Sequence, residues 1–221
     1  MLFDFHTHTT LSDGELLPME LIRRAIVNDY RALGISDHVS ASTIARVIKE
    51  VGADCELARK HWGFAALVGV ELTHVPPDAI AELAAEAKAL GAQYVVVHGE
   101  TPVEPVAPGT NLAACRCSHV DLLAHPGLIS VEAAAAAAEN EVFLELTARQ
   151  GHCLGNGLVA KVAQQVGAEM LVNTDAHAPG DLLTQERAVA VAAGAGLDEQ
   201  QIEQVLIRNP ETLLARAGIK L

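Results

Sequence analysis

Short apolar runs alternate with amphipathic stretches along the whole chain. Seven runs rich in Val, Leu, Ile and Ala have the length of buried strands and occupy residues 1–5, 32–36, 65–70, 94–97, 120–124, 142–146 and 170–173. The stretches between them carry apolar residues at helical spacing, which indicates a repeating strand–helix unit. Such a repeat favours parallel strands joined by crossover helices.

The amphipathic stretches also contain helix start and stop signals. Pro18 opens the first helix, a second runs from residue 42 to a stop at Gly52, and another continues through residue 59. Further helices are expected over residues 77–91, 130–140, 158–166 and 185–193. The last long helix begins at Asp198, where Gln201 completes a capping box, and Pro210 ends it and starts a short terminal helix. The proline-rich residues 101–109 are expected to form an irregular loop.

Seven strands are one short of the eight-stranded parallel barrel. A barrel is favoured because polar residues end most of the strands, and a barrel gathers all strand ends at one mouth. An open doubly wound sheet is the alternative, but it would spread these residues along an edge. With 221 residues and no linker, the chain is predicted to form a single domain over residues 1–221.

The composition indicates which binding partners and which cellular compartment to expect. The formal net charge is −13 and no Lys/Arg stripe with interleaved aromatics occurs, so no stable nucleic-acid partner is expected. A nucleotide substrate stays compatible with this charge, because bound cations can reverse the sign inside one pocket. We expect a soluble, cytoplasmic protein. The four cysteines form no CxxC pair, the N-terminus is unlike a signal peptide, and no apolar stretch is long enough to span a bilayer. No feature indicates an oligomeric state.

Residue types that bind metals follow the predicted strands at a nearly regular spacing. The steps between them are each about thirty residues, the length of one strand–helix unit, and the last step is about two units. The residues are His8, His38, Glu71, His98, His125 and Asp175. His6 and His8 alternate along one strand end, so both side chains point the same way and can hold one ion. A single strand-end histidine is more often a core residue than a ligand, but several in step predict a multinuclear metal site.

Two carboxylates end strands that are otherwise apolar. Glu71 follows residues 65–70 and Asp175 follows residues 171–174. An isolated buried charge is very costly, and a metal ion is a partner that removes this cost. A carboxylate, unlike a neutral imidazole, can also bridge two ions.

Asp13, His38 and His177 form a second layer of candidate ligands, although Asp13 followed by Gly14 also fits an ordinary turn. Asp37 should alternate away from His38 and is interpreted as a carboxylate that orients a neighbouring ligand.

Arg149 and His152 follow the sixth predicted strand and should lie near the mouth. Arg149 is a candidate phosphate clamp and His152 a candidate substrate contact. A salt bridge of Arg149 on this acidic surface is the open alternative. His74 is expected only to line the rim.

Six motifs, in their order along the chain, resemble those of the PHP (polymerase and histidinol phosphatase) family. They are residues 6–14 (HTHTTLSDG), Ser36-Asp37-His38, Gly69-Val70-Glu71, His98, His125-Pro126-Gly127 and Asp175-Ala176-His177. The resemblance spans residues 6–177 and implies a distorted seven-stranded (β/α)7 TIM-like barrel, in agreement with the strand count.

The resemblance also implies a ligand set and catalytic residues. One ion would be held by His6, His8, Glu71 and Asp175, a second by Glu71, His98 and His125, and a third by Asp13, His38 and His177. Glu71, Asp175 and His177 would be the catalytic residues. Some family members carry His at the position of Asp13, and no other ligand position departs from the pattern.

This ligand set implies a chemistry and a substrate class. Nitrogen and oxygen donors without a thiolate suit two or three divalent ions of Zn, Mn or Fe. The implied reaction is hydrolysis of a small phosphomonoester by attack of a metal-bound hydroxide, without a phosphoenzyme. Histidinol phosphate is the first choice, because stand-alone members of this compact form resemble histidinol phosphatases. Nucleoside monophosphates or oligonucleotide ends are the alternative substrates.

Two alternatives lie outside this activity. An amidohydrolase barrel also starts with HxH and ends with a strand-end Asp, but it often bridges its metals by a carboxylated lysine, and no Lys ends a strand here. A non-catalytic metal-binding PHP module is the other alternative, and the complete ligand set argues against it.

Overall fold

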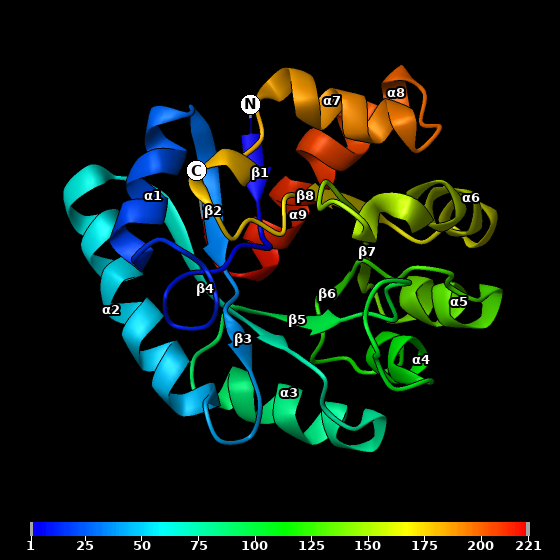
Figure 1. The fold of residues 1–221 in the computed structure, drawn as a ribbon, viewed down its shortest axis with the longest axis horizontal. Helices are drawn as coiled ribbons and strands as arrows, with labels where there is room; N and C mark the ends of the chain where they lie inside the picture. Colours follow the sequence, from blue (N-terminus) through cyan, green and yellow to red (C-terminus); the bar gives the residue numbers. More distant parts are fainter. Residues whose placement is uncertain (1, 220–221) are drawn as a thin grey trace.

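A ring of helices surrounds a central set of strands (Figure 1). The structure is a computed structural model that describes residues 2–219. Met1, where the first predicted strand begins, and residues 220–221 of the predicted domain lie outside this range. No helix of the described residues is long and apolar enough to cross a membrane.

The strands form a nearly closed barrel with seven positions. They pair in the order β1-β2-β4-β5-β6-β7-β8, all parallel, and β3 pairs with β4 beyond the end of β2. The strands are β1 (Leu2–Asp4), β2 (Tyr30–Ile35), β3 (His38–Val39), β4 (Ala65–Leu72), β5 (Tyr94–His98), β6 (Leu122–Ala124), β7 (Phe143–Thr147) and β8 (Met170–Asn173). The predicted distorted (β/α)7 barrel is therefore confirmed.

The seam between β1 and β8 is closed mainly by side chains. A bridge between Thr7 and Ala176 is the parallel backbone pairing at this seam. Below it, the backbone N–H of Phe5 donates to Asn173 Oδ1 at 2.9 Å, and the Thr174 hydroxyl donates to Asp4 Oδ2 at 2.5 Å. Buried polar side chains thus replace the ladder that a regular barrel would have here.

Alternation along the strands separates the barrel interior from the helix layer. In β4, Leu67 belongs to the interior cluster, whereas Val68 and Val70 pack in the outer core. Two-residue periodicity then turns Glu71 toward the interior at the carboxyl end of β4. His98 follows Tyr94 and Val96 in the same way along β5. The pattern that builds the core therefore also aims these polar residues into the mouth.

Helices cover the outside of the strands and one end of the barrel. They are α1 (Pro18–Val27), α2 (Ile44–Trp62), α3 (Ile80–Ala89), α4 (Thr110–Cys115), α5 (Val131–Glu139), α6 (Asn156–Val166), α7 (Gln185–Gly194), α8 (Glu199–Glu203) and α9 (Asn209–Arg216). Short 3-10 turns are η1 (Pro77–Ala79), η2 (His152–Gly155) and η3 (Pro179–Asp181), and η4 (Gln204–Arg208) is π-helical. Leu213 and Leu214 of α9 join the interior cluster and so close the end opposite the mouth.

The helix stop predicted at Gly52 is wrong, because α2 runs without a break through Ile44–Trp62. Val47, Val51 and Cys55 form a fully buried stripe on α2, and their burial outweighs the roughly 1 kcal/mol that glycine costs in a helix. The left-handed Gly63 caps α2 instead, with φ of 61°.

The break predicted at Pro210 is also only partly correct. Pro210 lies in the first turn of α9, but η4 joins α8 to α9 without a loop. The capping box of Asp198 and Gln201 is confirmed by two hydrogen bonds of 2.9 Å.

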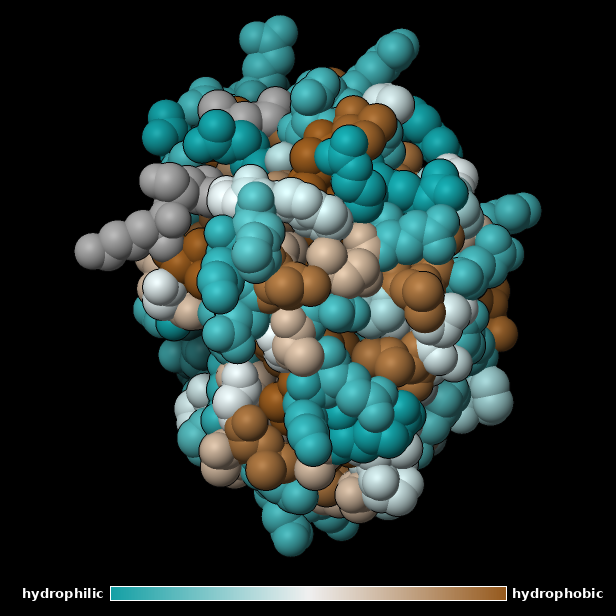
Figure 2. Space-filling view, turned by 90° about the vertical axis from the view of Figure 1, so that its left-hand side faces the viewer, coloured by the Kyte–Doolittle hydropathy of each residue, from teal (hydrophilic) through white to brown (hydrophobic). Residues whose placement is uncertain are grey.

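The face over α1 and α2 is mainly polar. Figure 2 shows apolar atoms there in small separate areas among polar ones, and the exposed large apolar side chains include Val27 and Trp62. Scattered apolar side chains of this kind are normal for a folded surface. The candidate metal-binding side chains lie elsewhere, at the carboxyl ends of the strands.

Candidate metal centre

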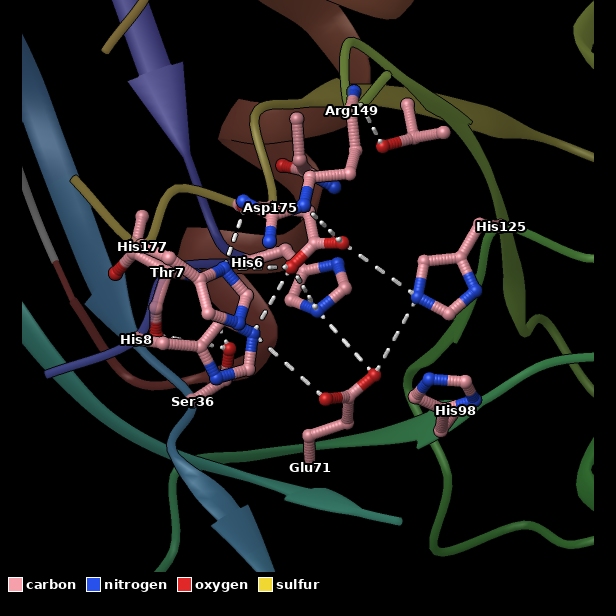
Figure 3. A network of polar contacts seen from close by, with 12 residues as sticks. His6, Thr7, His8, Ser36, Glu71, His98, His125, Arg149, Asp175 and His177 are labelled. Carbon is pink, nitrogen blue, oxygen red and sulfur yellow. Dashed lines mark hydrogen bonds and ion pairs between the residues drawn. The ribbon is translucent and has the colours of Figure 1, made fainter. Parts of the chain in front are cut away.

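The predicted ligands meet at the mouth of the barrel. Figure 3 shows His6 and His8 from the chain after β1, Glu71 from β4, His125 after β6 and Asp175 after β8 arranged around one small space. All five side chains are buried. Residues that are up to 169 positions apart in the sequence are therefore within contact distance.

Asp175 faces the histidine pair. Its Oδ1 lies 3.1 Å from His8 Nε2 and 3.6 Å from His6 Nε2. Together the three side chains form a group whose ligand atoms lie within 4.8 Å of one another. Two histidines on one face of a strand end, predicted to share an ion, are thus joined by the carboxylate from the opposite side of the seam.

Glu71 lies at the centre of the site. Its Oε1 is 3.2 Å from His6 Nε2 and 3.8 Å from His125 Nε2. Its Oε2 is 2.6 Å from His38 Nδ1 and 3.7 Å from His8 Nε2. One fully buried carboxylate therefore faces four imidazoles on two sides.

Asp13 joins a second group above His8. Its Oδ1 lies 3.5 Å from His38 Nε2 and 3.3 Å from His177 Nε2. The His177 Nδ1–H donates to the carbonyl of Asp175 at 2.9 Å, which leaves Nε2 free to face Asp13. His8, Asp13, His38 and His177 thus form a four-residue group suited to one ion.

Asp37 holds the loop that carries Asp13, as expected for an orienting carboxylate. Its Oδ1 accepts hydrogen bonds from the Thr9 backbone N–H at 2.7 Å and from the Ser12 hydroxyl at 2.6 Å, and its Oδ2 accepts from the Thr9 hydroxyl at 2.7 Å. Asp37 is fully buried, and its hydrogen-bond partners are Thr9 and Ser12 rather than a histidine.

His98 lies between His125, its predicted neighbour, and a carboxylate of the loop after β5. Its ring lies 4.4 Å from that of His125, but its Nε2 is 3.0 Å from Glu104, a residue of the loop after β5. His74, His98 and Glu104 form a group of their own, and His125 forms groups with His6 and Glu71.

The unpaired atoms of the cluster fit divalent metal binding. Within the described residues, His6 Nε2, both ring nitrogens of His8, Glu71 Oε1 and Asp175 Oδ1 are buried and lack a hydrogen-bond partner. Leaving such atoms unsatisfied is costly. The separations among these atoms of 3.1–3.6 Å are close to the roughly 3.4 Å that separates two ligands held about 2.1 Å from one tetrahedral ion. Imidazole and carboxylate donors suit a borderline divalent cation.

The electrostatics of the cluster divide its imidazoles into two kinds. Burial lowers the pKa of His6, but the charges of Glu145, Glu71 and Asp175 outweigh burial and raise this pKa well above its usual value. For His38, Glu71 and Asp13 outweigh burial in the same way and raise the pKa to about 10. A bound cation would replace these protons.

The other kind of imidazole is kept neutral. Burial, reinforced by the neighbouring His38, lowers the pKa of His8 well below its usual value. Burial and His98 do the same for His125. A neutral imidazole has a free ring lone pair and is therefore the form that binds metals.

Three residues of the mouth adopt a strained backbone. His74, His125 and Asp175 have φ values of 52°, 27° and 54°, in the left-handed region that side chains other than glycine disfavour. Strain of this kind persists where the surrounding structure over-determines it, commonly at functional sites. In this chain all three residues belong to groups of possible metal ligands.

Glu145 is a residue of the site that sequence reasoning missed. Its Oε1 accepts from His6 Nδ1 at 2.8 Å and from Asn173 Nδ2 at 3.0 Å, and its Oε2 accepts from the His125 backbone N–H at 2.8 Å. These contacts fix the His6 ring with Nε2 toward Glu71. A signal was present, since Glu145 is a carboxylate inside the apolar run Phe143-Leu144-Glu145-Leu146.

Arg149 and His152 both lie at the mouth. The His152 ring is buried, 4.5 Å from that of His125. Arg149 Nη1 is 3.5 Å from Asp181 Oδ2 and Arg149 Nε is 4.0 Å from Asp175 Oδ2. Arg149 thus forms the salt bridge that was the alternative, yet it also borders an open pocket of about 400 Å³ that Thr174 and Arg187 line with it.

Sequence comparison assigns the chain to a family. No protein-family model matches it. It is 49% identical over 217 residues to the uncharacterized protein MJ1295 of Methanocaldococcus jannaschii, a match that covers 98% of this chain and 100% of that protein. The chain belongs to the family of this archaeal protein.

Shorter matches connect it to proteins with functional names. A probable phosphatase of Shewanella is 31% identical over 130 residues, which is 50% of each protein. A 5'-3' exoribonuclease of Haemophilus influenzae is 37% identical over 71 residues, covering 32% of this chain and 23% of that protein. These two matches thus cover only a half and about a quarter of the length of the relatives.

Solved structures share the fold. A chain of archaeal ribonuclease P, solved with mature tRNA, superposes with a TM-score of 0.73 at 14% identity, covering 97% of this chain and 90% of that one. A structure described as a metal-dependent phosphoesterase from Bifidobacterium adolescentis gives a TM-score of 0.50 at 15% identity, covering 90% and 97%. At these identities the similarity concerns the barrel alone.

Proposed function

We propose that this chain is a metal-dependent phosphoesterase that hydrolyses a small phosphomonoester at the mouth of the barrel. The observation that carries the proposal is Glu71, a fully buried carboxylate between two groups of histidines whose inward atoms lack partners. The names of the partial relatives, a probable phosphatase and a 5'-3' exoribonuclease, support the same reaction class.

The nine predicted residues would hold two or three divalent ions of Zn, Mn or Fe. When bound, such ions lower the pKa of a coordinated water and neutralise phosphoryl oxygens. Glu71 and Asp175 would fix the separation of the ions from opposite sides of the mouth. His177 would complete the group of Asp13 and remain beside the reacting phosphoryl group.

Arg149 and His152 would bind the substrate. The guanidinium can leave Asp181, to which it is held by one contact of 3.5 Å, and donate two N–H groups to a phosphoryl oxygen pair. Burial lowers the pKa of His152, and the opposing charge of Glu104 does not reverse this shift. A neutral His152 at the mouth can accept or donate one hydrogen bond to the substrate.

The substrate proposed first is histidinol phosphate, and nucleoside monophosphates or oligonucleotide ends are second. The match to an exoribonuclease over 71 residues favours the second class. The pocket of about 400 Å³ beside Arg149 has room for a compact leaving group.

The amidohydrolase alternative lacks its bridging residue. The lysines among residues 2–219 lie on α2, α3 and α6, in the helix layer rather than at the mouth. Glu71 occupies the central position instead.

Phosphate release from purified protein tests the proposal. The substrates would be histidinol phosphate, AMP, a short 5'-phosphorylated oligonucleotide and p-nitrophenyl phosphate, each with Zn, Mn or Fe added to chelator-treated protein. We expect turnover that depends on metal and falls by at least about 10³-fold in Glu71→Ala, as for loss of a central electrostatic residue.

Metal content measured on the same samples separates the alternatives. Metal binding without turnover of any substrate would indicate the non-catalytic module. Full turnover in metal-stripped or Glu71→Ala protein would contradict the proposal.

A further inference from the structure

Three neighbouring loops at the mouth each present an exposed apolar side chain. The loops follow β5, β6 and β7, which pair side by side, and they carry Val103, Leu128 and Leu154. Leu128 and Leu154 are each 75% exposed, more than any other large apolar side chain of the described residues, and Val103 is 48% exposed. Exposed apolar side chains gathered in one place commonly mark a binding surface, whereas single ones do not.

Glycines bring the loops after β6 and β7 into direct contact. An added Cβ at Gly155 would lie 2.5 Å from the carbonyl oxygen of Gly127 and 2.9 Å from its Cα. Leu128 directly follows Gly127, and Leu154 directly precedes Gly155. The backbone segments that carry the two leucines therefore touch.

Val103 extends this surface from the loop after β5. An added Cβ at Gly151 would lie 3.3 Å from Val103 Cγ1 and 3.7 Å from its Cγ2. Gly151 precedes the turn of residues 152–155, which contains Leu154. Val103, Leu128 and Leu154 are called the apolar rim below.

The apolar rim is continuous with the candidate metal centre. His125 lies three residues before Leu128, and His152 lies two residues before Leu154. The two imidazole rings are 4.5 Å apart, and both side chains are buried. Two of the three loops thus pair a buried histidine of the mouth with an exposed leucine beside it.

The position of the rim indicates which part of a substrate would reach it. In the proposed reaction the phosphoryl group lies at the candidate metal centre, and side chains such as Phe5 and Tyr94 fill the barrel interior below. The alcohol part of the substrate must therefore extend outward past the loops. An apolar ring on this alcohol would cover the exposed leucines and remove apolar surface from water. A protein partner on the same loops would stand in the way of the alcohol that has to leave.

We propose that the apolar rim binds the planar ring of the leaving alcohol and so selects nucleoside phosphates over phosphates of small polar alcohols. The inference rests on the proposed function and favours the second of its two substrate classes. Leu128 and Leu154 contact a face of the base, and Val103 contacts its edge. The base takes no part in bond making, so these residues determine specificity and are not catalytic.

AMP and ribose 5-phosphate are the matched substrates for the test, because they share the phosphate and the sugar and differ in the base. In metal-reconstituted wild-type protein, kcat/KM for AMP should exceed that for ribose 5-phosphate by about 10- to 100-fold, the effect expected for covering one ring. In Leu128→Ser/Leu154→Ser this ratio should fall to about 3-fold or less, because the apolar surface is lost.

The matched control is Leu57→Ser/Leu90→Ser. It changes two exposed leucines on α2 and at the end of α3, outside the rim, and should keep the wild-type ratio. Circular dichroism verifies that each variant is folded.

The outcomes separate this inference from the proposed function. Equal kcat/KM for both substrates in the wild type, or an unchanged ratio in Leu128→Ser/Leu154→Ser, would overturn the role of the rim and leave the phosphoesterase intact. A lack of turnover of any phosphomonoester would contradict both proposals. Light scattering that finds a wild-type dimer and a monomeric rim variant would assign the rim to a second copy of the chain and would also overturn the inference.

Discussion

Single side chains decide the geometry of the mouth, and Glu145 shows how. This carboxylate is fully buried and uses both oxygens to hold His6, Asn173 and the backbone of His125. It does not face the space between the histidine groups. Its effect on a metal ion must therefore pass through the imidazoles that it orients.

Glu145→Gln should weaken zinc binding by about 10- to 100-fold, because an amide cannot accept at both positions and the His6 ring loses its fixed orientation. Competition with a chromophoric chelator would measure the affinity. Glu139→Gln, on α5 outside the mouth, is the matched control and should leave the affinity unchanged. An affinity in Glu145→Gln equal to that of the wild type would show that the contact with His6 is not needed for binding.

At the scale of elements, the close fit of Tyr94 inside the barrel limits its neighbours. Tyr94 of β5 is fully buried and fills the space beside Gly34 of β2 and Gly69 of β4. An added Cβ at Gly69 would lie 2.2 Å from Tyr94 Cζ, and one at Gly34 would lie 2.2 Å from its Oη. Glycine is thus required on β2 and β4, because Tyr94 of β5 fills the space that a larger side chain there would occupy.

Gly69→Ala should lower the free energy of unfolding by about 3 kcal/mol, because overpacking forces the ring or the strand to shift. Gly157→Ala on α6 is the control, since an added Cβ there meets nothing within 4 Å, and it should raise this free energy by up to about 1 kcal/mol. Urea denaturation compares them. Equal stabilities of Gly69→Ala and the wild type would contradict the fit described for Tyr94.

Most strands and helices could be predicted from the sequence, and one helix end could not. Most strands and helices appear where apolar periodicity placed them, and Met170–Asn173 has the predicted bounds. The stop predicted at Gly52 was wrong because burial of Val47 and Val51 outweighs the local effect of the glycine. That burial depends on packing against the barrel, which a short stretch of sequence does not show.

For the whole molecule, closure of the barrel depends on a buried polar contact between its first and last strands. Asp4 accepts from the Thr174 hydroxyl and from the backbone N–H groups of His6 and Thr174. Burial outweighs these hydrogen bonds and raises the pKa of Asp4 from 3.8 to about 7. The folded protein therefore holds a proton that the unfolded chain releases at lower pH.

The sign of the resulting pH dependence follows from linkage. Between pH 4 and 7 the native state binds more protons at Asp4 than the unfolded chain does, so this residue makes stability fall as pH rises through that window. Asp4→Asn removes the ionisation and keeps an acceptor for both N–H groups. The free energy of unfolding of Asp4→Asn, relative to the wild type, should increase by up to about 4 kcal/mol between pH 4 and 7. Denaturant titrations at each pH measure this difference, and a constant difference across the window would contradict it.

The order of apolar and polar residues was enough to predict the strand–helix alternation, the parallel barrel and most of the residues that meet at its mouth. It could do so because period-two burial turns every second residue inward, and the carboxyl ends of parallel strands share one side of the barrel. Glu71 and Asp175 were readable as carboxylates at the ends of apolar strands.

How these residues are grouped and held became visible only in the folded barrel. Contacts such as those of Glu145 with His6 and of Asp4 with Thr174 join residues 139 and 170 positions apart, and no local pattern encodes such a distance. Glu104 reaches His98 from an irregular loop, where neither strand nor helix periodicity indicates the direction of a side chain. Strands fix direction by regular geometry, whereas loops and seams fix it by packing, and packing exists only once the barrel has closed.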